Sequence, residues 1–139
     1  MAAHLQNWHV QVWAGIGFGS DGAGVVLGSL LVLAMPLCEE ILFRGYLMKI
    51  LGRRLGHAYV AVIVTAVTFA SLHVFRTTSL HELSLHFVAG IGYGMVRLYS
   101  GSWVDAWLAH TVVNVAILAP KWFLAVCSYW FVPKLLEAQ

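Results

Sequence analysis

Long apolar runs separated by short polar breaks dominate the chain. Each run approaches the roughly 20 residues that an α-helix needs to cross a bilayer, and polar and apolar positions do not alternate as they do in membrane strands. The pattern therefore predicts an all-α, polytopic membrane helical bundle of about four to five transmembrane helices. The runs cover Gly24–Leu51, Ala58–Phe75, Glu82–Tyr99, Trp103–Ala119 and Trp122–Leu136, the last of which contains Pro133.

The breaks between the runs carry turn-forming residues. They read GRRLGH, RTTSLH, YSGS and AP, so we expect the helices to end there. The first residues differ from the rest, because tryptophan and phenylalanine stand among glycines and histidines, a mixture that favours the membrane–water interface. We expect residues 1–23 to form an interfacial N-terminal lead-in and residues 24–139 to form one membrane core.

Composition indicates that lipid is the solvent of this chain. Of its 139 residues, 60% are apolar and only 10% are charged, whereas soluble domains carry about 25% charged residues. So few charges could not cover a surface that faces water. The net charge of +2 is too small to indicate a nucleic acid partner, and the first partner that we expect is the lipid bilayer.

The basic residues beside the runs predict an orientation. If the helices alternate in direction, most of these residues fall on one side of the membrane, which is then the cytoplasmic side. The first helix should thus run from outside to the cytoplasm. We also expect a multi-pass integral membrane protein, in a prokaryotic cell membrane. The larger set is Lys49, Arg53, Arg54, Arg97 and Lys134, and the smaller set is Arg76 and Lys121.

Ionisable residues inside the apolar runs are the candidate functional groups, because a charge in a membrane helix is costly and usually faces the protein interior. The first run carries Glu39, Glu40 and Arg44. At about 100° per residue, Glu40 and Arg44 share one helix face and can form an ion pair. Glu39 then points away from that pair and is available as a base in a cavity.

Two further runs carry polar or aromatic residues one helical turn apart. Phe69 and His73 lie on the second run, and His110 and Asn114 lie on the fourth. If the helices converge, Glu39 and His73 can together hold and deprotonate a water molecule. His110 and Asn114 can then donate hydrogen bonds to the oxyanion that forms when this water attacks a peptide carbonyl.

These residues stand in three ordered motifs. Residues 39–47, EEILFRGYL, resemble the EExxxRGxL signature of the CAAX-prenyl-protease and bacteriocin-processing (CPBP) family of intramembrane glutamic endopeptidases, also called the abortive-infection family. Residues 69–73, FASLH, resemble its FxxxH motif, and residues 110–114, HTVVN, resemble its HxxxN motif. The similarity runs from about Leu33 to Ala119, and the motif order on three apolar runs makes it specific.

The resemblance implies an α-helical membrane fold and an intramembrane endopeptidase, with residues 24–139 as its core. Its substrates would be membrane-associated proteins or peptides, whether prenylated or sorting-tagged, and it would need no cofactor. The first glutamate and the second-motif histidine are expected to activate water, and the third-motif pair is expected to stabilise the oxyanion. The catalytic set implied is Glu39, His73, His110 and Asn114, with Glu40 and Arg44 in support.

Two other patterns suggest different chemistry. His81, Glu82 and His86 resemble the HExxH zinc motif, but the spacing of five residues turns the second histidine about 140° from the first. We expect no zinc site there, and we expect His81 and Glu82 to cap the third helix. Cys38 could form a nucleophilic site with His73, although a cysteine in an apolar run is more often a buried packing residue.

Two other functions remain open. Glu39, His73 and His110 are suitable ligands for zinc or manganese, so the chain could be a metal-dependent membrane protease or a carrier of metal or haem. The motifs could also serve packing alone in a non-catalytic scaffold or immunity protein. We favour the metal-free protease, whose activity should fall at acidic pH if Glu39 acts as a base.

Overall fold

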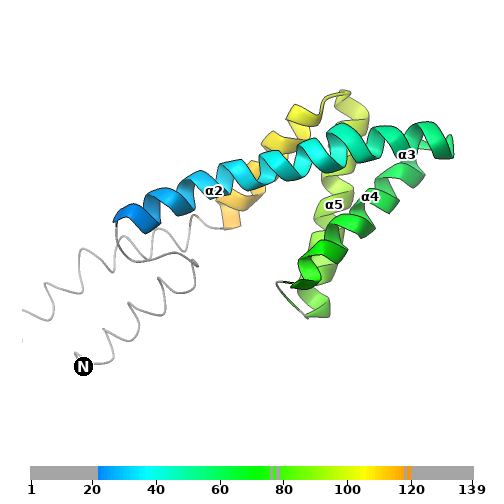
Figure 1. Cartoon of the computed structure of the whole chain (residues 1–139). Helices are drawn as coiled ribbons and strands as arrows, with labels where there is room; N and C mark the ends of the chain where they lie inside the picture. Colours follow the sequence, from blue (N-terminus) through cyan, green and yellow to red (C-terminus); the bar gives the residue numbers. More distant parts are fainter. Residues whose placement is uncertain (1–21, 76, 78, 118, 120–139) are drawn as a thin grey trace, which may run out of the picture. The chain divides into compact units, whose positions relative to one another are not determined.

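The computed structural model describes residues 22–75, 77, 79–117 and 119, and every element in these ranges is helical (Figure 1). The predicted all-α class is therefore confirmed. The fifth apolar run and nearly all of the predicted lead-in lie outside the described residues. The elements are α2 (Gly22–Glu40), the π-helix η1 (Ile41–Leu47), α3 (Met48–Leu55), α4 (Ala58–Leu72), the 3₁₀-helix η2 (His73–Phe75), α5 (Leu80–Ser100) and a helix over residues 103–117.

The chain divides into two compact units. One consists of Met1–Ala34 with Val113–Gln139, and the other is Met35–Val112. The second unit contains every predicted site residue except Asn114. The predicted boundary between a lead-in and a core at residue 23 stays a prediction.

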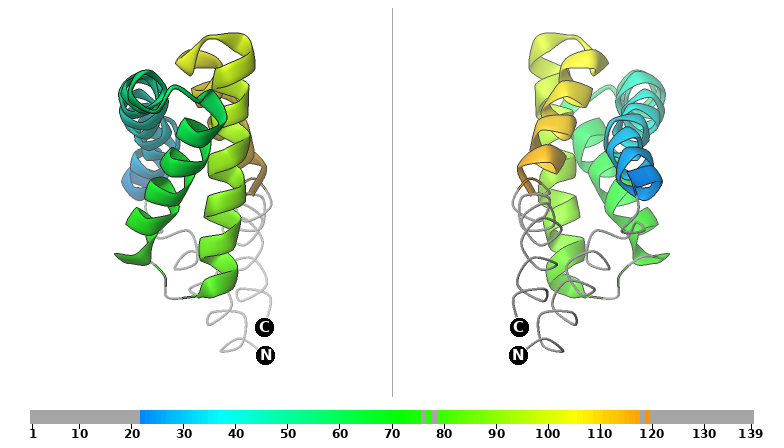
Figure 2. Two further views of the ribbon diagram at one scale, coloured as in Figure 1. Left: turned by 90° about the vertical axis from the view of Figure 1, so that its right-hand side faces the viewer. Right: turned by 90° about the vertical axis from the view of Figure 1, so that its left-hand side faces the viewer.

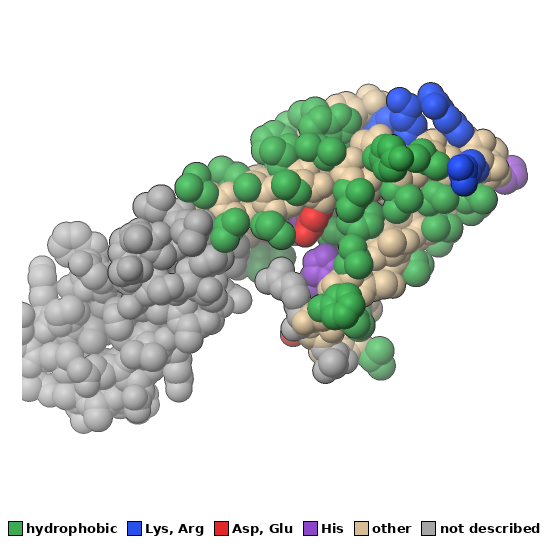
Figure 3. All heavy atoms as spheres, viewed as in Figure 1, with side chains coloured by type: hydrophobic (Ala, Val, Ile, Leu, Met, Phe, Trp, Pro, Cys, Tyr) green, Lys and Arg blue, Asp and Glu red, His purple; other side chains and the backbone are tan. Residues whose placement is uncertain are grey.

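One helix among the described residues is long and apolar enough to cross a membrane. It covers Ala58–Phe75 and has a mean hydropathy of 2.0. Apolar side chains also cover much of the face of the described residues in Figure 3, and several on α4 are exposed, such as Ile63 and Val67. A helix that is apolar on its outer face suits lipid as solvent. The number of four to five spanning helices stays a prediction.

The periodicity of the first apolar run suggested one continuous α-helix, which is wrong. α2 ends at Glu40, and the chain continues as the π-helix η1 before α3 begins. A π-helix closes its hydrogen bonds over five residues instead of four, so a uniform rotation of 100° per residue is wrong for Ile41–Leu47. Such turns are frequent at functional sites, and this one contains Arg44.

Glycine ends two helices at predicted breaks. Gly56 after α3 has a φ of +70°, and Gly101 after α5 has a φ of +73°. Both values lie in the left-handed region, which a residue without a β-carbon adopts at little cost. The breaks GRRLGH and YSGS are thus confirmed as helix ends.

The start of α5 differs from the prediction. The helix begins at Leu80, and the Oγ of Ser79 accepts a hydrogen bond from the backbone N–H of Glu82 at 3.4 Å. Ser79 is therefore the N-cap, and the prediction that His81 and Glu82 cap this helix is wrong. The serine side chain is short, so its hydroxyl oxygen can accept a hydrogen bond from an unpaired N–H group of the first helical turn.

Small residues let α4 and α5 pack side by side (Figures 1 and 2). A β-carbon placed on Gly94 would lie 2.8 Å from Cγ1 of Val62, and one on Gly90 would lie 3.1 Å from Cα of Ala66. Side chains at these two positions would push the helices apart. The glycines of the third apolar run therefore allow this close helix packing.

Candidate active site

A buried ion pair joins the first motif to α5. Nη1 of Arg44 donates a hydrogen bond to Oε1 of Glu40 at 2.7 Å, and both side chains are fully buried. Nη2 of Arg44 donates to the backbone carbonyl of Gly90 at 2.7 Å. The predicted pairing of Glu40 with Arg44 is thus confirmed. The bond from Arg44 to Gly90 joins η1 to α5. Removing one partner of the buried Glu40–Arg44 pair should be strongly destabilising.

Three aromatic rings surround the Arg44 guanidinium. Its central carbon lies 5.0 Å from the ring centre of Phe69, 5.4 Å from that of Tyr93 and 5.8 Å from that of Phe43. A cation within about 6 Å of a ring centre is attracted by the ring electrons. These rings therefore offset part of the cost of burying the charge.

His110 bridges the two glutamates of the first motif. Its Nδ1 lies 2.9 Å from Oε1 of Glu40, and its Nε2 lies 3.8 Å from Oε2 of Glu39. An ionised carboxylate only accepts hydrogen bonds, so Nδ1 carries a proton and donates a hydrogen bond to Glu40. Nε2 faces Glu39, whose side chain is 24% exposed while that of Glu40 is fully buried. The adjacent glutamates thus have different surroundings.

The hydrogen bond of His73 shows which of its nitrogens can act as a base. His73 begins η2, and its Nδ1 lies 2.9 Å from the backbone carbonyl oxygen of Phe69. Because a carbonyl only accepts, Nδ1 holds the proton in the neutral ring and the lone pair lies on Nε2. In this tautomer, Nε2 is the nitrogen that can take up a proton.

The ring of Phe69 links the histidines of the second and third motifs. Its centre lies 4.7 Å from that of His73 and 5.8 Å from that of His110, and its side chain is buried. The phenylalanine of the second motif thus contacts both imidazoles. We refer to the residues gathered here as the polar cluster: Glu39, Glu40, Arg44, His73 and His110.

His86 and Tyr93 of α5 adjoin the polar cluster, and the sequence analysis missed both. The ring of His86 lies 3.9 Å from that of His73, with 32° between the planes, and Tyr93 stacks on His110 at 4.4 Å and 17°. Their spacing along the chain could have identified them. His86, Gly90 and Tyr93 follow at i, i+4 and i+7, so they share one helix face.

Other predicted chemistry has less support in the geometry. Among the described residues, no group of three or more His, Cys, Asp or Glu side chains is arranged to hold a metal ion. Cys38 is a free and exposed thiol, so the expected buried packing role is wrong. Asn114 lies on the 103–117 helix one turn after His110, but it belongs to the other unit. Its oxyanion role stays a prediction.

The chain matches one protein family over most of its length. Residues 21–116 match the family described as type II CAAX prenyl endopeptidase Rce1-like, and this region holds all three motifs. The family consists of membrane-embedded proteases, so the resemblance found in the motifs is confirmed. No curated protein and no solved structure matches the chain.

Proposed function

The chain belongs to the type II CAAX prenyl endopeptidase Rce1-like family, and we propose that it is a membrane-embedded glutamic endopeptidase. The contrast between Glu39 and Glu40 supports this proposal best. Glu40 is fully buried and bound by Arg44 and His110, whereas Glu39 is partly exposed beside the same histidine. One carboxylate holds the site together, and the other is available to contact water.

In the proposed reaction, a water molecule lies between Glu39 and Nε2 of His73. One of these two groups takes a proton from the water while its oxygen attacks the carbonyl carbon of the scissile bond. Hydrogen bonds from Asn114 and from the imidazolium form of His110, in which Nε2 also carries a proton, stabilise the resulting oxyanion. The carbon–nitrogen bond then breaks, and the proton taken from water passes to the departing amine. The products are one carboxylate and one amine.

The proposed substrate is a protein with a prenylated cysteine near its C-terminus, cut on the C-terminal side of that cysteine. The family description supports this class. Membrane-associated peptides and sorting-tagged proteins are the alternatives. Assaying lipid-modified and unmodified versions of one peptide distinguishes them, because only a lipid-selective enzyme would prefer the modified peptide.

The proposed mechanism uses no metal, and elemental analysis tests this point. A metal-dependent protease would draw its ligands from Glu39, His73 and His110. Stoichiometric zinc or manganese in the purified protein that is lost in His73→Ala would overturn the metal-free mechanism.

The proposed function is tested with Glu39→Gln and a matched control, Glu82→Gln. Glu82 is an exposed carboxylate in the first turn of α5 and has no part in the polar cluster. Each variant and the wild-type chain are brought to equal membrane levels, and protein termini in the host are compared by mass spectrometry. We expect new termini with the wild type and Glu82→Gln only. The same termini in all three strains would favour the scaffold function.

A further inference from the structure

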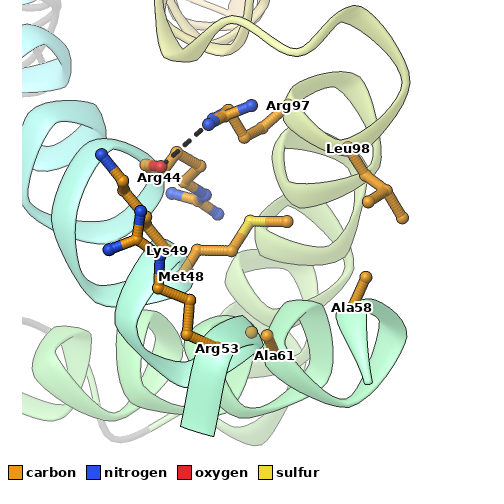
Figure 4. A pocket seen from close by; sticks show the side chains of 9 residues that line it. Arg44, Met48, Lys49, Arg53, Ala58, Ala61, Arg97 and Leu98 are labelled. Carbon is orange, nitrogen blue, oxygen red and sulfur yellow. Dashed lines mark hydrogen bonds between the residues drawn. The ribbon is translucent and has the colours of Figure 1, made fainter. Parts of the chain in front are cut away.

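The Met35–Val112 unit also contains a pocket of about 240 Å³ that is lined by residues of η1, α3, α4 and α5 (Figure 4). A water molecule takes up about 30 Å³ of liquid, so the pocket has room for a phosphate group. Four of its nine lining residues are basic. We refer to it as the basic pocket, after Arg44, Lys49, Arg53 and Arg97.

Among the described residues, Lys49, Arg53 and Arg97 of the basic pocket have no ion-pair partner. No acidic side chain lines the pocket, and among the described residues the only ion pair of the four basic side chains joins Arg44 to Glu40. Nε of Arg97 donates to the neutral backbone carbonyl of Arg44 at 3.3 Å, and Nε of Arg44 is buried without a hydrogen-bond partner. Neighbouring charges of one sign repel, so a bound anion would stabilise this arrangement.

The N-terminus of α4 adds positive potential to the pocket. Its first residue, Ala58, lines the pocket, its first turn holds no acidic residue, and His57 makes no side-chain capping bond. Unpaired N–H groups at a helix start attract anions. Arg53 and Arg97 also lie in the last turns of α3 and α5, where a cation is favourable. That effect does not account for Lys49, which stands in the first turn of α3.

The basic pocket lies at one end of the candidate membrane span. Ala58 is both a lining residue and the first residue of that span. Close by in the sequence, Tyr59 is exposed, as is Tyr99 near the end of α5, and tyrosine is enriched where membrane meets water. Lysine and arginine side chains gather at one end of the described residues in Figure 3. If the candidate span crosses the bilayer, its ends lie at the level of the lipid headgroups.

We propose that the basic pocket binds the phosphate of an anionic phospholipid headgroup. Lys49 and Arg53 would contact the phosphate oxygens, and the apolar side chains of Met48 and Leu98 would contact the adjoining lipid. Basic pockets between membrane helices bind anionic headgroups in this way. The pocket shares Arg44 with the polar cluster, but Lys49 and Arg53, the proposed phosphate contacts, lie outside that cluster.

The test compares the double variant Lys49→Gln/Arg53→Gln with Arg54→Gln. Arg54 neighbours Arg53 and is exposed, but it does not line the pocket. The full chain is placed in phosphatidylcholine nanodiscs that contain a minor fraction of phosphatidylglycerol, and the retained phosphatidylglycerol is counted by native mass spectrometry. At roughly fivefold per basic residue, we expect the double variant to bind about twenty- to thirtyfold more weakly. Arg54→Gln should bind like the wild type.

Three outcomes would overturn the proposal. The first is unchanged phosphatidylglycerol retention in a double variant that keeps its helix content and unfolding temperature. The second is an equal loss in Arg54→Gln, because a diffuse surface attraction would then suffice. The third is displacement of the lipid by inorganic phosphate at matched concentration, which would make a free anion the ligand.

Discussion

The polar cluster and the basic pocket share Arg44, yet they arrange charge in opposite ways. In the polar cluster, a buried cation is paired with Glu40, and His110 bonds to the same carboxylate. In the basic pocket, Lys49, Arg53 and Arg97 have one sign of charge and no carboxylate among the lining residues. Lys49 and Arg53 are exposed, whereas the Glu40–Arg44 pair has no access to solvent.

This difference follows from the cost of removing a charge from water. A buried charge must find an opposite charge and hydrogen bonds inside the protein, so the polar cluster shows how the protein satisfies its own groups. An exposed group of like charges is tolerated because solvent screens it. The charges of the basic pocket therefore stay available to an anion outside the chain, and the two regions should respond differently to mutation and to pH.

The largest effect is expected from Arg44→Met. The variant leaves Glu40 buried without its cation, so the free energy of unfolding in detergent micelles should fall by about 3–5 kcal/mol. Arg97→Met is the matched control, since among the described residues the half-buried Arg97 bonds only to a backbone carbonyl. Its loss should be at most about 1.5 kcal/mol, the net contribution of one hydrogen bond. Equal losses would contradict the distinction between paired and unpaired charge.

Acidic pH should affect cleavage at the polar cluster but not lipid binding at the basic pocket. Protonation of Glu39, which is faced by Nε2 of His110 and adjoins Glu40, removes the proposed base, so cleavage should fall by up to about tenfold per pH unit on the acidic limb. Proton uptake by His73 acts in the same direction. Phosphatidylglycerol retention should stay constant over the same range, because lysine and arginine side chains remain charged.

Both quantities can be measured on one preparation between about pH 4 and pH 8. A flat cleavage profile would exclude Glu39 as the base. A parallel loss of bound lipid would show that the fold, and not a single carboxylate, responds to acid.

A smaller effect is expected from Gly94→Ala. The new β-carbon would lie 2.8 Å from Cγ1 of Val62, and such overpacking costs about 1–3 kcal/mol of unfolding free energy. Gly92→Ala is the control, since nothing lies within 4 Å of its β-carbon position, and it should be neutral or stabilising by roughly 0.5–1 kcal/mol. Val62→Ala should restore part of the stability of Gly94→Ala. Both regions depend on this helix contact, so both should weaken together.

The sequence predicted pairings that lie along one helix better than contacts between helices. Glu40 and Arg44 are one turn apart, and their pair was predicted correctly. The π-helical form of Ile41–Leu47 was not predicted, and neither was the bond from Arg44 to the carbonyl of Gly90, which reaches another helix. The spacing of residues along the sequence does not reveal contacts between different helices.

The basic pocket and His86 were missed for the same reason. The sequence analysis used Lys49, Arg53 and Arg97 only to orient the chain, because their convergence depends on how α3 packs on α4 and α5. His86 was considered only as half of a zinc motif. Its contact with His73 depends on the alignment of α4 with α5, which Gly90 and Gly94 allow.

The smallest effect on cleavage is expected from substitution of His86. This substitution tests whether the polar cluster extends onto α5. The ring of His86 lies against that of His73, and an aromatic pair contributes about 0.5–1.5 kcal/mol. His86→Ala should therefore lower kcat for peptide cleavage between about twofold and tenfold, because His73 loses the ring that holds its orientation. His86→Phe keeps a ring at this position and should restore most of the rate.

The exposed His81 is the control on the same helix, and His81→Ala should leave kcat unchanged. Rescue by phenylalanine would make His86 a positioning residue that acts through the shape of its ring. If His86→Phe is as slow as His86→Ala in folded protein, the ring nitrogens themselves are needed, and His86 would join Glu39 and His73 in proton transfer. Wild-type rates in both variants would mean that the polar cluster ends at His73, with α5 contributing only the carbonyl of Gly90 and the ring of Tyr93.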